Sequence, residues 1–225
     1  SGSKNKLPRR DFIKKTSLAT AGVYLGSLAL SAKSYARIIG SNDRVNVGVI
    51  GFSDRFKYSL LPAFQNHSSE LNFDIVALSD IWKVRREEGQ AHLLKSLGHD
   101  VNAYRNNEEL YNSKSVDAVI ISTADFQHAL HVIEAVNAGC DAYVEKPFAE
   151  TMADNRAALK AIKNSKQIVQ IGSQRRSGPN YHAAADFIQS GKFGDITSVE
   201  LTWHVNQPGR WRRPALVAQM KEEDT

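Results

Sequence analysis

The chain has 225 residues, of which 42% are hydrophobic and 24% are charged, a composition that can bury a core and excludes a disordered chain. Its formal net charge is +5, but residues 1–36 hold seven of the 29 basic residues and one of the 24 acidic ones, which leaves 22 basic and 23 acidic residues. This near-neutral remainder gives no support for nucleic-acid binding. The single cysteine, Cys140, excludes an internal disulfide and a cysteine-based metal cluster. We expect no metal, and we expect Cys140 to be a small buried residue instead of a catalytic one.

Residues 1–36 have the features of a secretory signal. Basic residues around Arg9-Arg10 precede the uncharged run Thr16–Leu30, and Ser34-Tyr35-Ala36 has small residues where a signal peptidase needs them. The paired arginines followed by Asp-Phe-Ile-Lys resemble the twin-arginine class, and the apolar run is short for a membrane span. We therefore expect twin-arginine export to the periplasm or another extracytoplasmic space, without a permanent membrane anchor. An uncleaved anchor or an amphipathic N-terminal helix is the alternative.

From residue 44 onward, short apolar runs alternate with amphipathic segments. Strands are predicted at Val45–Gly51, Phe73–Ser79, Val101–Tyr104, Asp117–Ser122, Ala142–Val144 and Ile168–Gly172. Helices are predicted at Ser59–Asn66, Lys83–Leu97, Asn107–Tyr111, Asp125–Ala138 and Met152–Asn164. This alternation predicts an α/β fold with a doubly wound parallel sheet of the Rossmann type. In such sheets ligands bind beyond the carboxyl ends of the strands.

The helix predicted from Asp125 illustrates the local signals. Asp125 is in position to cap its N-terminus, Phe126, Leu130, Ile133 and Val136 recur at helical spacing, and Gly139 ends it.

The first strand ends in an incomplete dinucleotide-binding motif. With Gly51 as the first glycine of G-x-G-x-x-G, Phe52 follows it, Ser53 takes the second glycine position and Phe56 the third. A serine still lets a backbone approach a pyrophosphate, whereas Phe56 must change how helix and strand pack. At the second strand end, Asp80 can accept both ribose hydroxyls and repel a 2′-phosphate, which favours NAD over NADP. A helix-capping role for Asp80 is the alternative.

The fourth and fifth strand ends carry a family resemblance. The segments Ser122-Thr123-Ala124-Asp125-Phe126-Gln127-His128-Ala129 and Ala138–Ala149, which includes Glu145-Lys146-Pro147, resemble the Gfo/Idh/MocA oxidoreductases. The resemblance runs from Val45 to Trp203. It implies that Lys146 is catalytic and lies beside the nicotinamide and the reacting hydroxyl. It also implies that Glu145 and Pro147 shape the turn. By the same resemblance, Thr123 and His128 line the cofactor. A proton acceptor beside the departing hydride suits alcohol oxidation. The alternatives are a solvated surface lysine and a surface histidine.

Beyond Gly172 the chain resembles that family's crossing into an α+β substrate domain. We expect a Rossmann domain at 43–173 and the beginning of a substrate and oligomerisation domain at 174–225, with a helix at Tyr181–Ser190 and a strand at Ile196–Trp203. Residues placed to reach a sugar, or alternatively to serve an interface, are Arg175, Arg176, Tyr181, Trp211 and Arg212, with His204 and Asn206. Because residues 221–225 follow no helix or strand pattern, we expect this chain to be the N-terminal part of a longer, homo-oligomeric protein.

The resemblance implies an NAD-dependent oxidoreductase acting on a sugar or sugar derivative at a secondary alcohol. Since free NAD is expected to be scarce outside the cytoplasm, we expect a bound cofactor that is recycled within one turnover. One alternative is an NAD-dependent glycoside hydrolase that works through transient oxidation. A second alternative, an exported carbohydrate-binding protein without catalysis, is motivated by Ser53 and Phe56, whereas Asp80 and Glu145-Lys146-Pro147 argue against it.

Overall fold

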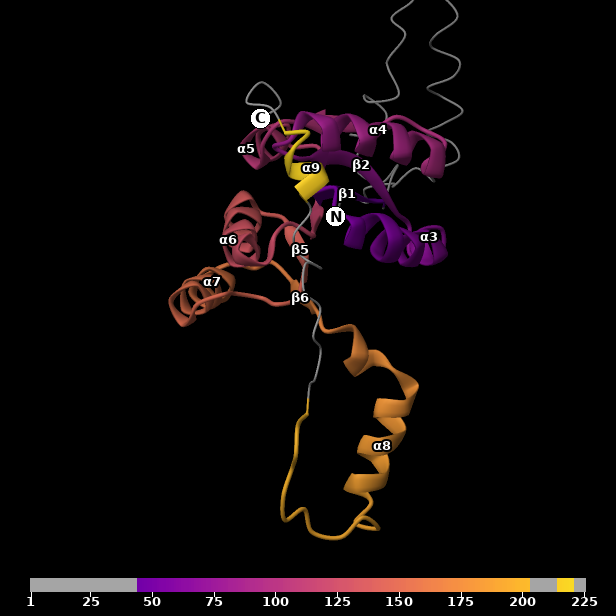
Figure 1. The fold of residues 1–225 in the computed structure, drawn as a ribbon, viewed down its shortest axis with the longest axis vertical. Coiled ribbons are helices and arrows are strands. Elements are labelled where there is room, and N and C mark those ends of the chain that lie inside the picture. Colours follow the sequence, from indigo (N-terminus) through magenta and orange to yellow (C-terminus); the bar gives the residue numbers. More distant parts are fainter. Residues whose placement is uncertain (1–43, 203–213, 221–225) are drawn as a thin grey trace, which may run out of the picture. The chain divides into compact units, whose positions relative to one another are not determined.

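The computed structural model describes residues 44–202 and 214–220. The strands are β1 (Val45–Ile50), β2 (Phe73–Ser79), β3 (Asn102–Tyr104), β4 (Ala118–Ile121), β5 (Asp141–Glu145) and β6 (Val169–Gly172). The helical segments are η1 (Phe56–Leu60), α3 (Leu61–Ser68), α4 (Lys83–Leu97), α5 (Asn107–Asn112), η2 (Asp125–Gln127), α6 (His128–Ala138), α7 (Met152–Asn164), η3 (Gln174–Ser177), α8 (Pro179–Gln189) and α9 (Pro214–Val217) (Figure 1).

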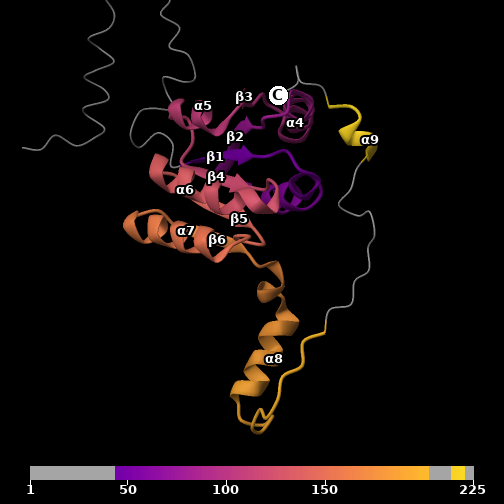
Figure 2. The same cartoon turned by 60° about the vertical axis from the view of Figure 1, so that its left-hand side comes forward.

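The strands form one parallel sheet in the order β3-β2-β1-β4-β5-β6, which Figure 2 shows from β3 at the top to β6 at the bottom. The order reverses between β1 and β4, which pair in parallel from Val47 opposite Ala118 to Ile50 opposite Ile121. This is the strand order of a dinucleotide-binding Rossmann fold, and β1 and β4 flank its ligand-binding crevice. The predicted fold class is confirmed.

Two hydrophobic cores cover the two faces of the sheet, because successive side chains of a strand point to opposite sides. Val49 of β1 packs in the core that α3 and α4 cover, and Ile50 packs in the core that α5 and α6 cover. Cys140 is buried in the second core, and its Sγ lies 3.6 Å from the Val116 carbonyl oxygen, as expected for a structural cysteine. Burial raises the pKa of the Cys140 thiol.

The prediction of a helix capped by Asp125 was wrong in detail. Residues Asp125–Gln127 form a 3₁₀ turn whose N-cap is Ala124, without a side-chain capping bond, and α6 begins only at His128. Helix α6 buries Ala129, Val132, Ala135 and Val136, whereas Phe126 and Leu130 are exposed. A 3₁₀ turn has three residues per turn, so it shifts which side chains face the sheet.

The strand predicted at Ile196–Trp203 is also not observed. Residues 196–202 have no regular secondary structure, and residue 203 lies outside the described part. A β-strand needs a neighbouring strand for its backbone N–H and C=O groups. No described segment pairs with residues 196–202, so their apolar pattern alone does not produce a strand.

The remaining predicted elements agree with the structure within a few residues, except that the first helix begins earlier, with η1 continuing directly into α3. Among the helices that the structure describes, none has both the length and the apolar character to cross a membrane.

Candidate functional site

The turn after β1 is hydrogen-bonded to the ends of the adjacent strands β2 and β4 at the carboxyl edge of the sheet. Gly51 has a φ of +83°, and a Cβ there would lie 2.7 Å from Thr123 Cγ2. Its N–H donates to the Ser79 carbonyl at 2.8 Å, and the Ser122 hydroxyl donates to its carbonyl at 2.9 Å. Only glycine meets both the conformational and the spatial requirement, so Gly51 has the place predicted for the first glycine of the motif.

Ser53 lies in this turn, and Phe56 begins the helical segment η1 that follows it. Ser53 Oγ accepts a hydrogen bond from the Phe56 N–H at 3.1 Å, and Phe56 is fully buried with its ring centroid 5.9 Å from that of Phe52. The helix that follows opens with the π-helical segment η1. Gly89 of α4 leaves space for the neighbouring Phe52, since a Cβ there would lie 3.0 Å from the Phe52 ring and 2.4 Å from Leu78 Cδ2. The chain therefore forms the turn without glycine at positions 53 and 56, and the packing change expected from Phe56 stays a prediction.

Asp80 lies beside this turn and holds it. Its Oδ2 accepts a hydrogen bond from the Phe52 N–H at 2.9 Å, and its Oδ1 accepts one from the Trp82 N–H at 2.9 Å. Burial raises the pKa of Asp80, although these two N–H groups oppose the shift. The N-cap of α4 is Trp82, without a side-chain capping bond, so the capping alternative for Asp80 was wrong. The ribose role of Asp80 stays a prediction, and each carboxylate oxygen keeps a lone pair for a ligand hydroxyl.

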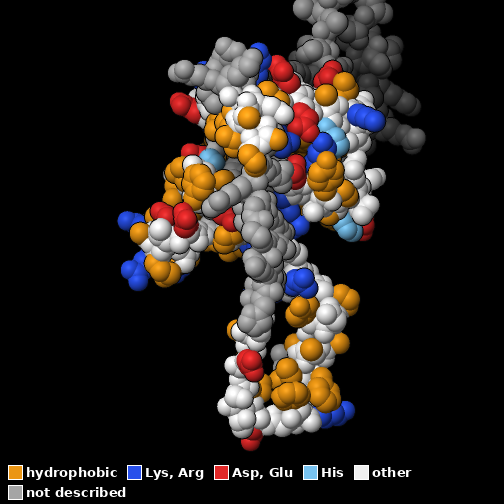
Figure 3. Space-filling view, in the orientation of Figure 1, with side chains coloured by type: hydrophobic (Ala, Val, Ile, Leu, Met, Phe, Trp, Pro, Cys, Tyr) orange, Lys and Arg blue, Asp and Glu red, His pale blue; other side chains and the backbone are white. Residues whose placement is uncertain are grey.

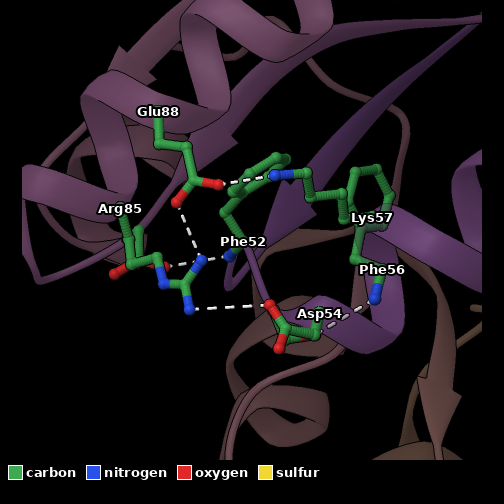
Figure 4. Close-up of polar contacts among 8 residues, drawn as sticks. Phe52, Asp54, Phe56, Lys57, Arg85 and Glu88 are labelled. Carbon is green, nitrogen blue, oxygen red and sulfur yellow. Dashed lines mark hydrogen bonds and ion pairs between the residues drawn. The ribbon is translucent and has the colours of Figure 1, made fainter. Parts of the chain in front are cut away.

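A charged cluster connects the turn to α4 (Figure 4). Lys57 Nζ lies 2.7 Å from Glu88 Oε1, and Arg85 lies 2.8 Å from Glu88 and 3.5 Å from Asp54. Arg86 Nη1 donates to the Asp80 carbonyl at 2.7 Å. Lys57 and Arg85 are therefore engaged by carboxylates, and Arg86 is engaged by the Asp80 carbonyl.

His128 joins two strand-end segments. Its Nδ1 lies 2.7 Å from the Pro147 carbonyl oxygen, its Nε2 lies 3.2 Å from the Thr123 carbonyl oxygen, and the side chain is fully buried. The alternative of a surface histidine was wrong. Because both ring nitrogens face backbone oxygens, the ring holds the β4 turn and the Pro147 turn together. Its predicted contact with a cofactor stays a prediction.

The Glu145-Lys146-Pro147 turn follows β5 and includes a cis Lys146-Pro147 peptide bond. Glu145 is buried and Oε1 lies 2.9 Å from Arg55 Nη2, whereas Lys146 is exposed. Arg55 was not among the site residues predicted from the sequence. A basic side chain inside a dinucleotide-binding turn was the signal that could have identified it.

The structure does not bring the predicted sugar-binding residues together with Lys146. Arg175, Arg176 and Tyr181 are exposed and have no hydrogen bond or ion pair with the turn residues in the described part. Trp211 and Arg212, like His204 and Asn206, lie outside the described residues. The described residues also hold no group of three or more metal-ligating side chains.

Comparison with known proteins identifies the family of this fold. Residues 45–173 match the Gfo/Idh/MocA family, described as "Oxidoreductase family, NAD-binding Rossmann fold". The chain belongs to this family. Inositol 2-dehydrogenase from Salmonella paratyphi B is 34% identical over 122 residues, which are 54% of this chain and 35% of the relative. A glycosyl hydrolase family 109 protein from Shewanella baltica is 25% identical over 235 residues, with 92% of this chain and 50% of the relative covered. This chain therefore spans between a third and a half of these relatives.

Solved structures agree on the fold. The WlbA dehydrogenase from Bordetella pertussis, crystallised with NADH and UDP-GlcNAcA, matches with a TM-score of 0.60 at 19% identity over 67% of this chain and 43% of its own.

The residues present fit a nicotinamide dinucleotide. Gly51 leaves the turn free of a side chain where a backbone must approach a pyrophosphate. Thr123 Oγ1, next to that turn, is buried without a hydrogen-bond partner in the described part of the chain. Buried polar atoms normally have a hydrogen-bond partner, and a bound ligand can supply the one that Thr123 Oγ1 lacks in the described part.

Proposed function

We propose that this protein is an NAD-dependent oxidoreductase that acts on a sugar or sugar derivative at a secondary alcohol and retains its cofactor through turnover. The observation that carries the proposal is the position of Lys146, which is exposed at the carboxyl edge of a family Rossmann sheet and follows the buried Glu145. The inositol 2-dehydrogenase relatives support a polyol or sugar substrate.

The turn residues Gly51, Phe52 and Ser53 would hold the pyrophosphate, and Asp80 would accept the adenine ribose hydroxyls. The proposal favours NAD over NADP because a 2′-phosphate would meet the Asp80 carboxylate. Lys57 and Arg85 are occupied by Glu88, so they are not free to neutralise that phosphate. When bound, the nicotinamide ring accepts or donates the hydride.

Lys146 would accept the proton of the substrate hydroxyl. An exposed amine on a fixed turn can reach a substrate that lies against the carboxyl edge of the sheet. His128 keeps this turn in place through its contacts with the Pro147 and Thr123 carbonyls. The predicted contacts of a sugar with Arg175, Arg176 and Tyr181 have no support from the described contacts and stay predictions.

A glycoside hydrolase that oxidises its substrate transiently is the second candidate. The observation that favours it is the match to the family 109 glycosyl hydrolase, which covers 92% of this chain. Both candidates need NAD and Lys146. They differ in their net product, so incubation with sugars and with glycosides separates them.

We further propose that residues 1–36 are a twin-arginine signal and that the mature protein works in the periplasm or another extracytoplasmic space. The signal features of the sequence support this assignment. The proposed domains are a cofactor domain at 43–173 and the beginning of a substrate domain at 174–225. Replacing Arg9 and Arg10 together by lysine is expected to keep an uncleaved precursor in the cytoplasm, measured by fractionation and immunoblotting.

The first experiment is the identification of nucleotide released by denaturing the purified full-length protein. Stoichiometric NAD supports the proposal, while no released nucleotide and no binding on titration contradict it. Lys146→Ala is then expected to lower turnover about 100-fold or more, since positioned acid–base groups contribute that much. Lys166→Ala, an exposed lysine before β6, is the matched control and should keep wild-type turnover.

Asp80→Asn tests the proposed cofactor preference. The variant keeps one acceptor for backbone N–H groups but loses the negative charge, so the ratio of NAD to NADP affinity should fall. Calorimetric titration with both nucleotides measures this ratio, and an unchanged ratio would contradict the proposed role of Asp80.

A further inference from the structure

Arg55 links two turns that are ninety residues apart in the chain. Arg55 lies in the turn after β1, where it is the N-cap residue of η1, and Glu145 is the last residue of β5. Arg55 Nη2 lies 2.9 Å from Glu145 Oε1. This ion pair connects the dinucleotide-binding turn directly to the turn that presents Lys146.

Burial makes the charge of Glu145 costly without a partner. The Glu145 side chain is 5% exposed and that of Arg55 is 36% exposed. Among the residues that the structure describes, none donates an aligned hydrogen bond to Glu145 Oε1, so Arg55 acts on it through charge. Gly172 of β6 leaves room for the carboxylate, since a Cβ there would lie 3.2 Å from Oε1. A buried carboxylate of this kind depends on its counter-ion.

Glu145 is followed directly by Lys146, so the Arg55–Glu145 ion pair ends one residue before the amine. In the described part of the chain, titratable groups near the pair include Tyr143 on β5, whose hydroxyl lies near Gly172, and His128, which contacts Pro147. An uncompensated carboxylate favours the charged form of a nearby amine, and an uncompensated guanidinium disfavours it. A neutralised Glu145 therefore places no net charge beside the turn that presents Lys146.

We propose that Arg55 is a positioning residue that neutralises Glu145, and that this charge balance sets the pH range in which Lys146 accepts a proton. The inference rests on the proposed function of Lys146. It assigns to the turn after β1 a part in proton transfer besides the binding of the dinucleotide.

The experiment compares Arg55→Ala, Glu145→Gln, the double variant and Arg55→Lys in the full-length protein. The acid limb of the pH–rate profile should move up by about half to one pH unit in Arg55→Ala and down by a similar amount in Glu145→Gln. The double variant and Arg55→Lys should stay near the wild-type limb. A purely structural role would not move the two single variants in opposite directions.

A second readout needs no turnover. Acetylation of Lys146 in nucleotide-free protein, followed across pH by peptide mass spectrometry, should give the same opposite shifts in its midpoint. Lys166 in the same samples is the internal control and should not shift. Arg44→Ala, which removes the Arg44–Asp74 pair at 2.8 Å before β1, is the matched arginine control and should leave the Lys146 midpoint unchanged.

The outcomes separate the inference from the function on which it rests. If Lys146→Ala keeps turnover, the proposed function of Lys146 is wrong. If Lys146→Ala loses turnover but Arg55→Ala and Glu145→Gln leave the acid limb and the labelling midpoint unchanged, or move them in the same direction, the inference about Arg55 is wrong.

Discussion

The sheet domain and the segment that follows it, residues 174–202, both carry large apolar side chains but bury them differently. Every α-helix between β1 and β6 buries at least one side chain. Helix α8 buries none, although it carries Phe187, which is 51% exposed, and Ile188. Figure 3 shows hydrophobic side chains at the surface of this segment. Local sequence therefore produces helices in both regions, whereas burial requires a packing partner.

The largest expected effect tests this contrast with one pair of variants. Phe56→Ala removes a fully buried ring and should lower the free energy of unfolding by about 3–5 kcal/mol. Phe187→Ala in the same 225-residue chain removes an exposed ring and should cost less than about 1 kcal/mol. Urea unfolding followed by circular dichroism measures both values. Equal costs for the two variants would contradict the contrast.

A second pair separates backbone conformation from close packing. Gly51 and Gly98 both have positive φ, at +83° and +79°. A Cβ at position 51 would meet Thr123 at 2.7 Å, whereas a Cβ at position 98 meets nothing within 4 Å. Gly98→Ala should therefore cost about 1 kcal/mol of stability, and Gly51→Ala should cost about 2 kcal/mol or more.

The same pair has a functional readout. Gly51→Ala should also weaken NAD binding, measured by calorimetry, because the added methyl group displaces the turn. Gly98→Ala, which ends α4 away from the turn, should leave the affinity unchanged. A Gly51→Ala protein with wild-type stability would show that the Thr123 contact relaxes without cost.

The order of elements, the parallel sheet and the strand ends that carry Gly51, Asp80, Thr123 and Lys146 could be predicted from the sequence. Each depends on a local signal, namely an apolar run, a break in periodicity or a motif at a strand end. The bounds predicted for α7 were those observed, because Thr151 caps it through the Asp154 N–H and Ser165 follows its last residue.

The parts that could not be predicted depend on contacts between distant segments. Arg55 and Glu145 are ninety positions apart, and only the fold shows that they meet. Gly89 makes room for Phe52 from a helix whose sequence gives no reason for a glycine there. The strand predicted at Ile196–Trp203 also depends on a distant segment. Residues 196–202 have the local pattern of a strand, but no described segment supplies the strand with which they would pair.

The smallest expected effect on stability comes from removing one carboxylate charge, either in the sheet domain or in residues 174–202. Glu134 of α6 lies 3.0 Å from His131 Nδ1 and accepts a hydrogen bond from Asn107 Nδ2 at 2.8 Å. The contact with His131, followed by that with Asn107, lowers the pKa of Glu134 below 4.5, although burial opposes the shift. A lowered folded-state pKa means that the folded chain binds fewer protons. Its stabilisation is therefore complete above the unfolded-state pKa, near 4.5, and is lost as the pH falls through the folded-state value.

Urea unfolding of wild type and Glu134→Gln, from about pH 6 downward, measures this contribution. We expect a difference below about 1 kcal/mol at the upper pH, because solvent screens a side chain that is 35% exposed. The difference should shrink as the pH falls below 4.5. Glu200→Gln is the control from residues 174–202, where the glutamate is exposed, and should follow the wild-type curve. If Glu134→Gln follows the wild-type curve at every pH, the contacts of Glu134 with His131 and Asn107 contribute no more to the free energy of unfolding than an exposed surface charge does.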